Sequence, residues 1–385
     1  RLPYLLQIVL KDCHKPILFS LAKHNDSFLS MLSFRPTSSI IIVTDNCNSR
    51  CITCSQWQDK STNELTTEEI YDALAQLRKL GVIRVAFNGG EPLLRHDLSR
   101  LVGRAAELRF QSISILTNGL LLTENRAREL LESGLTAVGI SIDGLQETHD
   151  YVRGATGSFD KAISALEILS RMREQRFPHL KVTITTTLTQ PTLNQVVPMT
   201  SLAGTYQKSA RFRISLFQTT PYFFQGVDAS GLIIEDQKEL DEVVRQLHDI
   251  KVKNPRVFIW NQTHQSFEYI KEYFTDSKRA DIPCIMGYFN IYVGAHGEVY
   301  HGCWALKPIG NVREKKLADI VNSTEYRKIL KDMFFKRCPG CACEYQINLL
   351  YHLPSIFREI LRVIRLKVSI HEEVKKSDQN CKSSA

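Results

Sequence analysis

Between Ser39 and about Ser215 the chain alternates short β-branched runs with segments that have helical spacing. The first run, Ile40-Ile41-Ile42-Val43, is typical of a strand buried on both faces. A capping box at Thr66-Thr67-Glu68-Glu69 then opens a helix. The same alternation predicts further strands at Val82–Phe87, Ser112–Leu116, Ala137–Ile142, Lys181–Leu188 and Arg211–Leu216. It predicts further helices at His96–Leu108, Glu124–Glu132, Phe159–Arg173 and Leu193–Leu202.

About six strand–helix units in succession constrain the fold class. Repeated units of this kind give a parallel sheet with right-handed crossovers, and therefore an α/β fold. Local pattern leaves two architectures open, an open doubly wound sheet and an incomplete barrel. In barrels of this type the active site lies at the carboxyl ends of the strands. The segments that follow the strands are the unusual ones in this sequence.

Cys47, Cys51 and Cys54 follow the first predicted strand with the spacing C-x3-C-x2-C. Four-iron clusters are normally held by four thiolates, so three thiolates would leave one iron open to a substrate or cofactor. A zinc site is the alternative, and it would need a fourth ligand close by in the sequence. No cysteine follows Cys54 until Cys284, which favours the iron–sulfur interpretation.

Glycines and polar residues follow the next three predicted strands. The glycines of Gly89-Gly90-Glu91 allow the backbone to approach a ligand closely, and the carboxylate can bind a cationic amine. Groups suited to ribose hydroxyls follow the third and fourth strands, at Thr117, Asn118, Ser141 and Asp143. Arg153 can pair with a carboxylate as a bidentate fork. Taken alone, each segment is also compatible with a common turn or a solvated charge.

A second group of cysteines begins at Cys284. Cys284 and Cys303 flank a predicted β-hairpin at Asn290–Tyr300, and Cys338, Cys341 and Cys343 follow. Clustered cysteines of this kind indicate metal or catalytic use. Four thiolates with a terminal C-x2-C also suit tetrahedral zinc, so a zinc ribbon stays open as the alternative.

Charge, hydropathy and cysteine usage restrict the partners and the compartment. The formal net charge of +8 is mild for 385 residues, and no zinc finger or RNP-like strand is present, so nucleic acid is not expected as a partner. No apolar run approaches the roughly 18 residues that span a bilayer, and no secretory signal is recognisable. Ten clustered cysteines in such a chain favour metal or catalytic use in a reducing compartment, the cytoplasm.

Residues 349–370 have the pattern of a basic amphipathic helix. One interpretation is a helix packed on the rest of the protein with a solvated basic face. The other is peripheral contact with an anionic membrane surface. The first interpretation is favoured.

The strand-end motifs occur in the order C-x3-C-x2-C, Gly-Gly-Glu-Pro, Thr-Asn-Gly and Ser-Ile-Asp-Gly, which resembles the radical S-adenosylmethionine (SAM) superfamily over roughly Ser39–Ser215. The resemblance implies a partial (β/α)6 TIM-like barrel. It also implies a [4Fe–4S] cluster with an open site, held by Cys47, Cys51 and Cys54 and chelated at the open iron by SAM.

The same resemblance assigns residues to SAM. Gly89, Gly90 and Glu91 would bind the methionine amine, and Ser141 and Arg153 would contact the ribose or the carboxylate. The remaining polar groups assigned to this cofactor are Thr117, Asn118 and Asp143. No G-x-I-x-G-x-x-E adenine motif follows the fifth predicted strand, so the adenine contacts are unassigned.

The spacing of glycines and cysteines from Cys284 onward resembles that of the SPASM/Twitch extension of radical SAM enzymes. This resemblance implies a small C-terminal Cys-rich α+β domain with one auxiliary [4Fe–4S] cluster. The ligands it implies are Cys284, Cys303, Cys338 and Cys341, with Cys343 spare or exchanging with Cys341.

These patterns divide the chain into five parts. They are an N-terminal extension (1–38), a radical SAM core (39–216), helices that complete the barrel (217–282), a SPASM/Twitch-like domain (283–348), and a basic amphipathic helix with a disordered tail (349–385).

The function that the resemblance implies is reductive cleavage of SAM to a 5′-deoxyadenosyl radical, which abstracts hydrogen from a substrate C–H bond. The outcome would be peptide maturation, or oxidation or epimerisation of a small molecule such as an aminosugar. A one-electron reductant such as flavodoxin or ferredoxin would supply the electron. The alternative is an Fe–S or zinc protein that transfers electrons or binds without cleaving SAM, which would have no use for an amine-binding loop beside its cluster.

Overall fold

The computed structural model describes residues 14–338, apart from residue 26 and the segments 31–35, 59–61, 220–221, 225–227 and 276–282. Cys341, Cys343 and the predicted helix at 349–370 lie outside the described residues.

Six parallel strands form the main part of the sheet, and each pairs with the next one along the chain. They are β1 Ser38–Ile42, β2 Arg84–Asn88, β3 Ser112–Thr117, β4 Ala137–Ser141, β5 Lys181–Leu188 and β6 Ala210–Leu216. Because the order never reverses, the sheet has no switch point of the doubly wound type, and right-handed crossovers place the connecting helices on one face. The strand order therefore decides in favour of the barrel.

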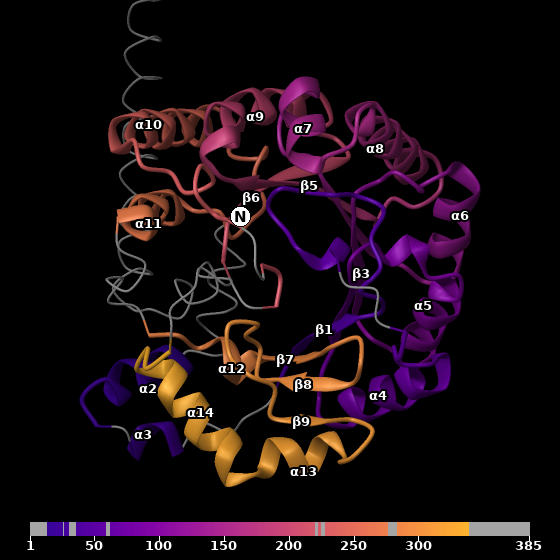
Figure 1. Ribbon diagram of the computed structural model, residues 1–385, viewed down its shortest axis with the longest axis vertical. Coiled ribbons are helices and arrows are strands. Elements are labelled where there is room, and N and C mark those ends of the chain that lie inside the picture. Colours follow the sequence, from indigo (N-terminus) through magenta and orange to yellow (C-terminus); the bar gives the residue numbers. More distant parts are fainter. Residues whose placement is uncertain are drawn as a thin grey trace, which may run out of the picture.

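The helices after the strands form an arc along the outside of the curved sheet (Figure 1). They are α4 Thr67–Lys79, α5 Leu98–Glu107, α6 Glu124–Glu132, α7 Gln146–Arg153, α8 Ser158–Gln175 and α9 Val196–Thr205. All match predicted helices except α7, where none is predicted. Within the described residues β6 and β9 are the two ends of the sheet and do not pair, so the barrel is partial, as predicted.

Alternation along β3, β4 and β6 separates an apolar outer face from a more polar inner face. In β6, Phe212 and Ile214 are buried in the main core, while Arg213 and Ser215 between them are only partly buried. Serine and threonine occupy similar inner positions on β3, β4 and β5, at Ser114, Ser141, Thr183 and Thr187. The concave face of the sheet is therefore polar and partly accessible.

The first helix of the core also connects to the C-terminal part of the chain. Thr66 and Glu69 form the predicted capping box, which is confirmed. The Glu69 carboxylate also accepts hydrogen bonds of 2.6 and 3.0 Å from the Arg313 guanidinium. Glu69 thus caps α4 and also binds Arg313, which lies 244 residues further along the chain.

The residues after β6 add two helices and then rejoin the sheet. These elements are α10 Gln237–Lys253, α11 His264–Thr275, α12 Met286–Phe289, β7 Asn290–Val293, β8 Glu298–Tyr300, β9 Gly310–Asn311, α13 Leu317–Asn322 and α14 Thr324–Phe334. The predicted hairpin is present as antiparallel β7 and β8. In addition, β7 pairs parallel with β1, so the hairpin continues the sheet of the core.

The N-terminal helices α2 His14–Ala22 and α3 Ser27–Ser30 lie beside this C-terminal part (Figure 1). Phe19 of α2 contacts the rings of Tyr288 and Phe334, with centroids 5.6 and 5.9 Å apart. The N-terminal helix α2 therefore packs against α12 and α14 near the end of the described residues.

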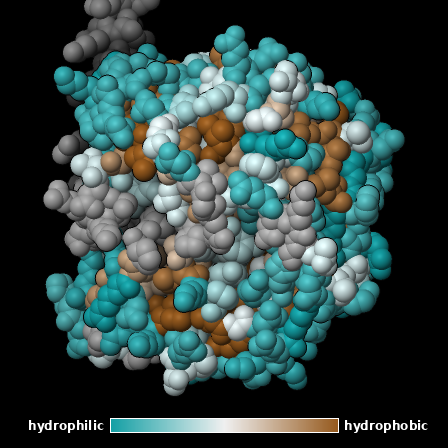
Figure 2. All heavy atoms as spheres, viewed as in Figure 1, coloured by the Kyte–Doolittle hydropathy of each residue, from teal (hydrophilic) through white to brown (hydrophobic). Residues whose placement is uncertain are grey.

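Figure 2 shows that hydrophilic side chains cover most of the outer rim of this face, whereas hydrophobic side chains gather mainly inside the arc of outer helices. Among the described residues no helix is long and apolar enough to cross a membrane.

Candidate active site at the carboxyl ends of the strands

The cysteine triplet lies in one loop that directly follows β1. Cys51 is buried, Cys47 and Cys54 are partly buried, and none of the three forms a disulfide. The backbone N–H of Ser49 points at the Cys47 sulfur from 3.5 Å. The loop therefore presents three free sulfur donors close together in the chain, at the end of the sheet where barrel enzymes place their chemistry.

Helix α7 supports this loop from one side. The backbone N–H groups of Arg50 and Ile52 donate to the carbonyls of Arg153 and Val152 at 3.1 and 3.0 Å, in the last turn of the helix. Gly154 then ends the helix in the left-handed conformation, with φ of 61°. A Cβ atom on Gly154 would collide with the Arg50 carbonyl, so glycine allows the close contact between helix and loop.

The Gly-Gly-Glu segment after β2 supports the loop from the other side. The Gly90 N–H donates to the Thr44 carbonyl over 2.9 Å. A Cβ atom on Gly89 would collide with the Thr44 carbonyl, and one on Gly90 with the carbonyls of Asp45 and Asn46. The two glycines are therefore required for packing against the backbone that leads into the cysteine loop. This packing role is separate from any contact with a ligand.

The Glu91 carboxylate is buried and accepts three hydrogen bonds from the protein. Its Oε1 accepts from the Thr117 hydroxyl at 2.7 Å and the Leu93 N–H at 3.1 Å. Its Oε2 accepts from the Asn118 N–H at 2.8 Å. Burial raises the pKa of Glu91, and these donors oppose the rise. The carboxylate thus fastens the end of β2 to the end of β3, and its contact with an amine stays a prediction.

Asn118 extends this network to the cysteine loop. Its side-chain N–H2 donates to the Asn48 side-chain carbonyl at 2.7 Å and to the Ser49 hydroxyl at 2.9 Å. Both acceptors lie between Cys47 and Cys51. The predicted site residues of the second and third strand ends are therefore brought together, and they hold the cysteine loop.

Replacing Glu91 with glutamine should destabilise the protein, because an amide N–H2 would face donors where the carboxylate only accepts. An unsatisfied buried group of this kind costs about 1–3 kcal/mol. Urea unfolding of Glu91→Gln measures this loss. The matched control is Glu147→Gln, at an exposed glutamate on α7, where a change below about 0.5 kcal/mol is expected. Equal stability of the two variants would contradict the role of the network.

Asp143 and Arg153 form a buried ion pair beside Cys51. The Arg153 Nη2 lies 2.7 Å from Asp143 Oδ2, and Nη1 lies 3.7 Å from the Cys51 sulfur. The other Asp143 oxygen accepts from the Thr187 N–H over 2.8 Å. Arg153 thus pairs with a carboxylate of the protein itself, and its guanidinium places positive charge next to Cys51.

Burial controls the protonation of these thiols. It raises the pKa of Cys47 to about 12 and that of Cys54 to about 11. Burial also raises the pKa of Cys51, against the lowering effect of Arg153. For Arg153, burial works against the charge, but Asp143 and Cys51 outweigh it and raise its pKa. A bound cationic metal centre deprotonates such thiols outright, so the donor set suits one.

Removing the charge of Arg153 should be costly, because Arg153→Met leaves the Asp143 carboxylate buried and without its cation. Breaking a buried pair in this way costs about 3–5 kcal/mol. The control is Arg171→Met, which removes an exposed pair with Glu124 and should cost at most about 1 kcal/mol. Guanidinium unfolding of both variants measures the difference. A loss for Arg153→Met no larger than the control would show that the pair contributes little.

The second group of cysteines lies in the C-terminal part. Cys303 is buried with Met286 and Met333, and Cys284 packs against the same cluster. Cys338 is partly buried and forms no disulfide. Three of the five predicted thiols are thus described, and two of them, Cys284 and Cys303, have largely apolar surroundings.

Within the described part of the chain, no three histidine, cysteine or carboxylate side chains converge as ligands of a single metal ion. A tetrahedral zinc ion needs all of its ligands within about 2.3 Å of one point. A cluster instead takes each thiolate on a different iron.

Comparison with known proteins gives the same assignment. Residues 41–196 match the radical SAM superfamily, and residues 284–344 match the SPASM iron–sulfur cluster-binding domain. The chain belongs to the radical SAM superfamily. The resemblance noted in the sequence is confirmed, and SAM and a [4Fe–4S] cluster are the cofactors that membership of this family implies.

This radical SAM protein is 38% identical over 141 residues to Fe-coproporphyrin III synthase of Methanosarcina barkeri, covering 35% of each chain. It is 26% identical over 293 residues to the sporulation killing factor maturation protein SkfB of Bacillus subtilis, covering 76% of this chain and 66% of the relative. Among the curated relatives compared, the chain spans 35–66% of their length.

The fold of the radical SAM protein also has solved counterparts. The structure of Streptococcus suis SuiB bound to the precursor peptide SuiA matches with a TM-score of 0.60 and 18% identity, covering 84% of this chain and 71% of SuiB. The likeness confirms the predicted fold class.

Sequence reasoning missed the residues that join the C-terminal hairpin to the cysteine loop. His296, in the turn between β7 and β8, has its Nε2 3.0 Å from Asp45 Oδ2 and its Nδ1 3.0 Å from the Asn63 carbonyl. The Glu64 carboxylate accepts from the Thr44 hydroxyl and the Asp45 N–H, both at 2.8 Å. Residues 251 positions apart offer no local pattern that could have revealed this contact.

Aromatic residues form a second junction between the same parts of the radical SAM protein. Trp304, next to Cys303, stacks with Tyr292 at 4.9 Å and lies 4.3 Å from the Tyr222 ring. The neighbouring Phe223 carbonyl accepts from the N–H and the hydroxyl of Ser55, beside Cys54. A packed aromatic group therefore lies between the two groups of cysteines.

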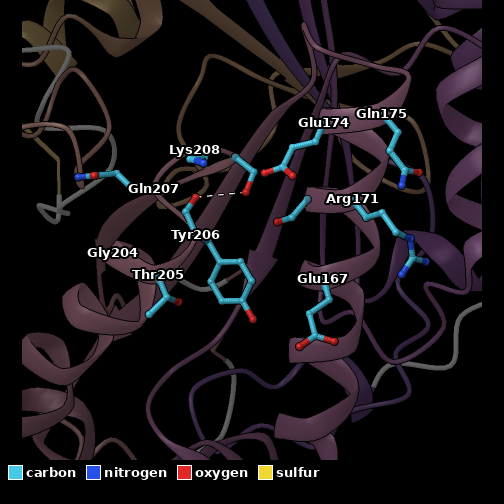
Figure 3. A pocket seen from close by; sticks show the side chains of 11 residues that line it. Glu167, Arg171, Glu174, Gln175, Gly204, Thr205, Tyr206, Gln207 and Lys208 are labelled. Atoms are coloured by element: carbon cyan, nitrogen blue, oxygen red, sulfur yellow. Dashed lines mark hydrogen bonds between the residues drawn. The ribbon is translucent and has the colours of Figure 1, made fainter.

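A surface recess of about 540 Å³ lies elsewhere (Figure 3). It is lined by the end of α8 and by residues 204–209, which lead into the start of β6. Because the strands are parallel, the recess lies at the end of the sheet opposite the cysteine loop. It is separate from the candidate site.

Proposed function

We propose that this protein is a radical SAM maturase that acts on C–H bonds of a peptide. The observation that carries the proposal is the convergence of the cysteine loop, the Gly-Gly-Glu segment and Arg153 at the carboxyl ends of β1 and β2 and the end of α7. When bound, the [4Fe–4S] cluster and SAM supply a 5′-deoxyadenosyl radical that abstracts hydrogen from the substrate.

In this proposal the residues of the chain have separate tasks. Cys47, Cys51 and Cys54 hold the cluster, and Arg153 offsets the negative charge of the thiolates. The backbone of Gly89–Glu91 receives the methionine amine of SAM beside the cluster. The ribose and carboxylate side of the same cofactor is assigned to Thr117, Asn118, Ser141, Asp143 and Arg153.

The polar inner face of the sheet is the proposed substrate surface. Ser141, Thr183, Thr187 and Arg213 line it from three neighbouring strands and are only partly buried. Hydroxyl and guanidinium groups suit the amides and carboxylates of a peptide. The sheet and its outer helices keep bulk water from the opposite side.

The extent of similarity favours a peptide over a small molecule. The similarity to the synthase of Methanosarcina barkeri covers 35% of this chain. The similarity to the sporulation killing factor maturation protein covers 76%, enough to reach beyond the core. The fold likeness to SuiB, solved with its precursor peptide, points to the same class. A small-molecule substrate is the alternative, and an assay in which no peptide is modified would support it.

The C-terminal part is proposed to hold one auxiliary [4Fe–4S] cluster. Its ligands would be Cys284, Cys303 and Cys338, with Cys341 or Cys343 as the fourth. A one-electron reductant such as flavodoxin or ferredoxin is the proposed partner. Peripheral membrane contact through residues 349–370 stays a prediction outside the described residues.

Anaerobic reconstitution with iron and sulfide tests the cofactor part of the proposal. About eight irons per chain are expected, as two four-iron clusters. Dithionite and SAM should then yield methionine and 5′-deoxyadenosine. Eight irons without 5′-deoxyadenosine would instead favour an electron carrier, and one zinc in the C-terminal part would make that part a structural module.

The substrate part needs its own assay. The reconstituted protein is incubated with SAM, dithionite and short peptides encoded beside its gene, and the peptides are examined by mass spectrometry. A peptide that loses hydrogen in a SAM-dependent way supports the proposal. If 5′-deoxyadenosine forms but all neighbouring peptides are unchanged while a small metabolite is consumed, the maturase assignment is wrong and the radical SAM assignment stands.

A further inference from the structure

His301 is a fully buried side chain with an unusual environment. It lies just after β8 and two residues before Cys303. Its exposed fraction is 0%, and within the described part of the chain neither ring nitrogen has a hydrogen-bond partner. The other histidine of the hairpin region, His296, has a partner at each nitrogen. The contrast marks His301 as a buried polar group without a partner among the described residues.

Leaving such a group unpaired is energetically costly. An unsatisfied buried donor or acceptor costs about 1–3 kcal/mol, and the great majority of buried polar groups have partners. A neutral imidazole carries one N–H donor and one acceptor nitrogen. A bound group beside the ring would remove most of this cost, so the site of His301 points to a ligand.

The backbone around His301 places the ring against α14. Gly302 adopts φ of 72° and packs on the start of β7, where a Cβ atom would lie 2.8 Å from the Asn290 carbonyl. The His301 ring then faces the ring of Tyr326, with 6.5 Å between centroids. The tight turn explains why His301 lies in the interior.

The same face of α14 covers the cysteines. Ile329, one turn after Tyr326, and Met333, one turn further, both pack in the cluster that contains Cys303 and Cys284. One helical turn rises about 5.4 Å. His301 therefore lies one to two turns along α14 from the thiols, with apolar side chains between them.

We propose that His301 donates its ring N–H to a sulfur of the auxiliary iron–sulfur cluster held by Cys284, Cys303 and Cys338, an inference that rests on the proposed function. Donation is favoured over ligation because the C-terminal part has five cysteines for four ligand positions. Hydrogen bonds to cluster sulfurs raise the reduction potential. His301 thus raises the reduction potential of the auxiliary cluster.

The test uses the full chain with Cys47, Cys51 and Cys54 replaced by alanine, so that only the auxiliary cluster remains. The protein is labelled with ¹⁵N-histidine, reconstituted, reduced with dithionite and examined by pulsed EPR. A weak ¹⁵N coupling is expected. It should vanish when His301→Gln is added with unlabelled glutamine, and persist when His296→Gln is added.

Redox titration provides the second measurement. His301→Leu should shift the midpoint potential of the auxiliary cluster to more negative values, and His301→Gln, which keeps an N–H donor, should shift it less. If His301→Leu fails to bind iron, the coupling in the parent protein still decides the question. The control His296→Gln should leave the potential unchanged.

The outcomes separate this inference from the proposed function. About four irons with no ¹⁵N coupling and an unchanged potential would overturn the role of His301 alone. A strong coupling would overturn donation, because it would make His301 an iron ligand. Protein without any bound iron would overturn the auxiliary cluster itself, and the inference with it.

Discussion

Replacement of Cys51 with alanine should abolish SAM cleavage. Cys51 is the buried member of the triplet and lies beside Arg153. Loss of the Cys51 thiolate therefore removes the most deeply buried of the three proposed ligands. A cluster left with two thiolates is not expected to survive purification. The reconstituted variant should hold about four irons per chain in place of about eight, and 5′-deoxyadenosine should fall below detection.

The control for this experiment is Cys381→Ala, at a cysteine that belongs to neither group in the sequence. It should retain about eight irons and wild-type turnover. Iron analysis and the absorbance of the thiolate-to-iron charge-transfer bands measure cluster content. Chromatography of the nucleoside products measures SAM cleavage independently. If Cys51→Ala kept both its iron content and its product, the cluster would have to be held elsewhere.

Replacement of Gly90 with alanine should have a comparably large effect without removing any ligand. The new methyl group would overlap the carbonyl oxygens of Asp45 and Asn46. These are backbone atoms, so the collision can be relieved only by moving the entrance of the cysteine loop. Displacements of about 1 Å near a reacting centre cost roughly 100-fold in rate. A loss of this size in 5′-deoxyadenosine formation is expected.

The matched control is Gly103→Ala, because a Cβ atom on Gly103 in α5 meets open space. Alanine should be slightly stabilising there, since glycine in a helix interior costs up to about 1 kcal/mol relative to alanine. Turnover of the control should be unchanged. Similar activities of Gly90→Ala and Gly103→Ala would show that the loop tolerates displacement, and that the glycines are not needed for packing.

Local sequence patterns predicted most of the barrel. The β-branched run at Ile40–Val43 and the capping box at Thr66 depend on neighbours within a few residues, and both occur where expected. Helix α7 was missed, because Gln146–Arg153 contains few apolar residues to show helical spacing. The choice between a barrel and a doubly wound sheet required the strand order, which no single segment contains.

The sequence motifs of the site could be predicted, but the hydrogen bonds and ion pairs between them could not. The cysteine spacing and the strand-end motifs identified the family from residues close in sequence. The partners of Glu91 and Asn118 are set by which strand ends become neighbours. The pairing of Asp45 with His296 requires β7 to lie next to β1, and such a contact leaves no trace in either local segment.

The pairing of β7 with β1 has a consequence for the order in which the chain can fold. Ser38–Ile41 pairs with Asn290–Val293, so one edge of β1 stays without its neighbour until synthesis has passed residue 293. Contacts between such distant segments form slowly, and an uncovered strand edge can pair with other chains. Fragments that end after β6 should therefore aggregate, because they leave this edge of β1 uncovered.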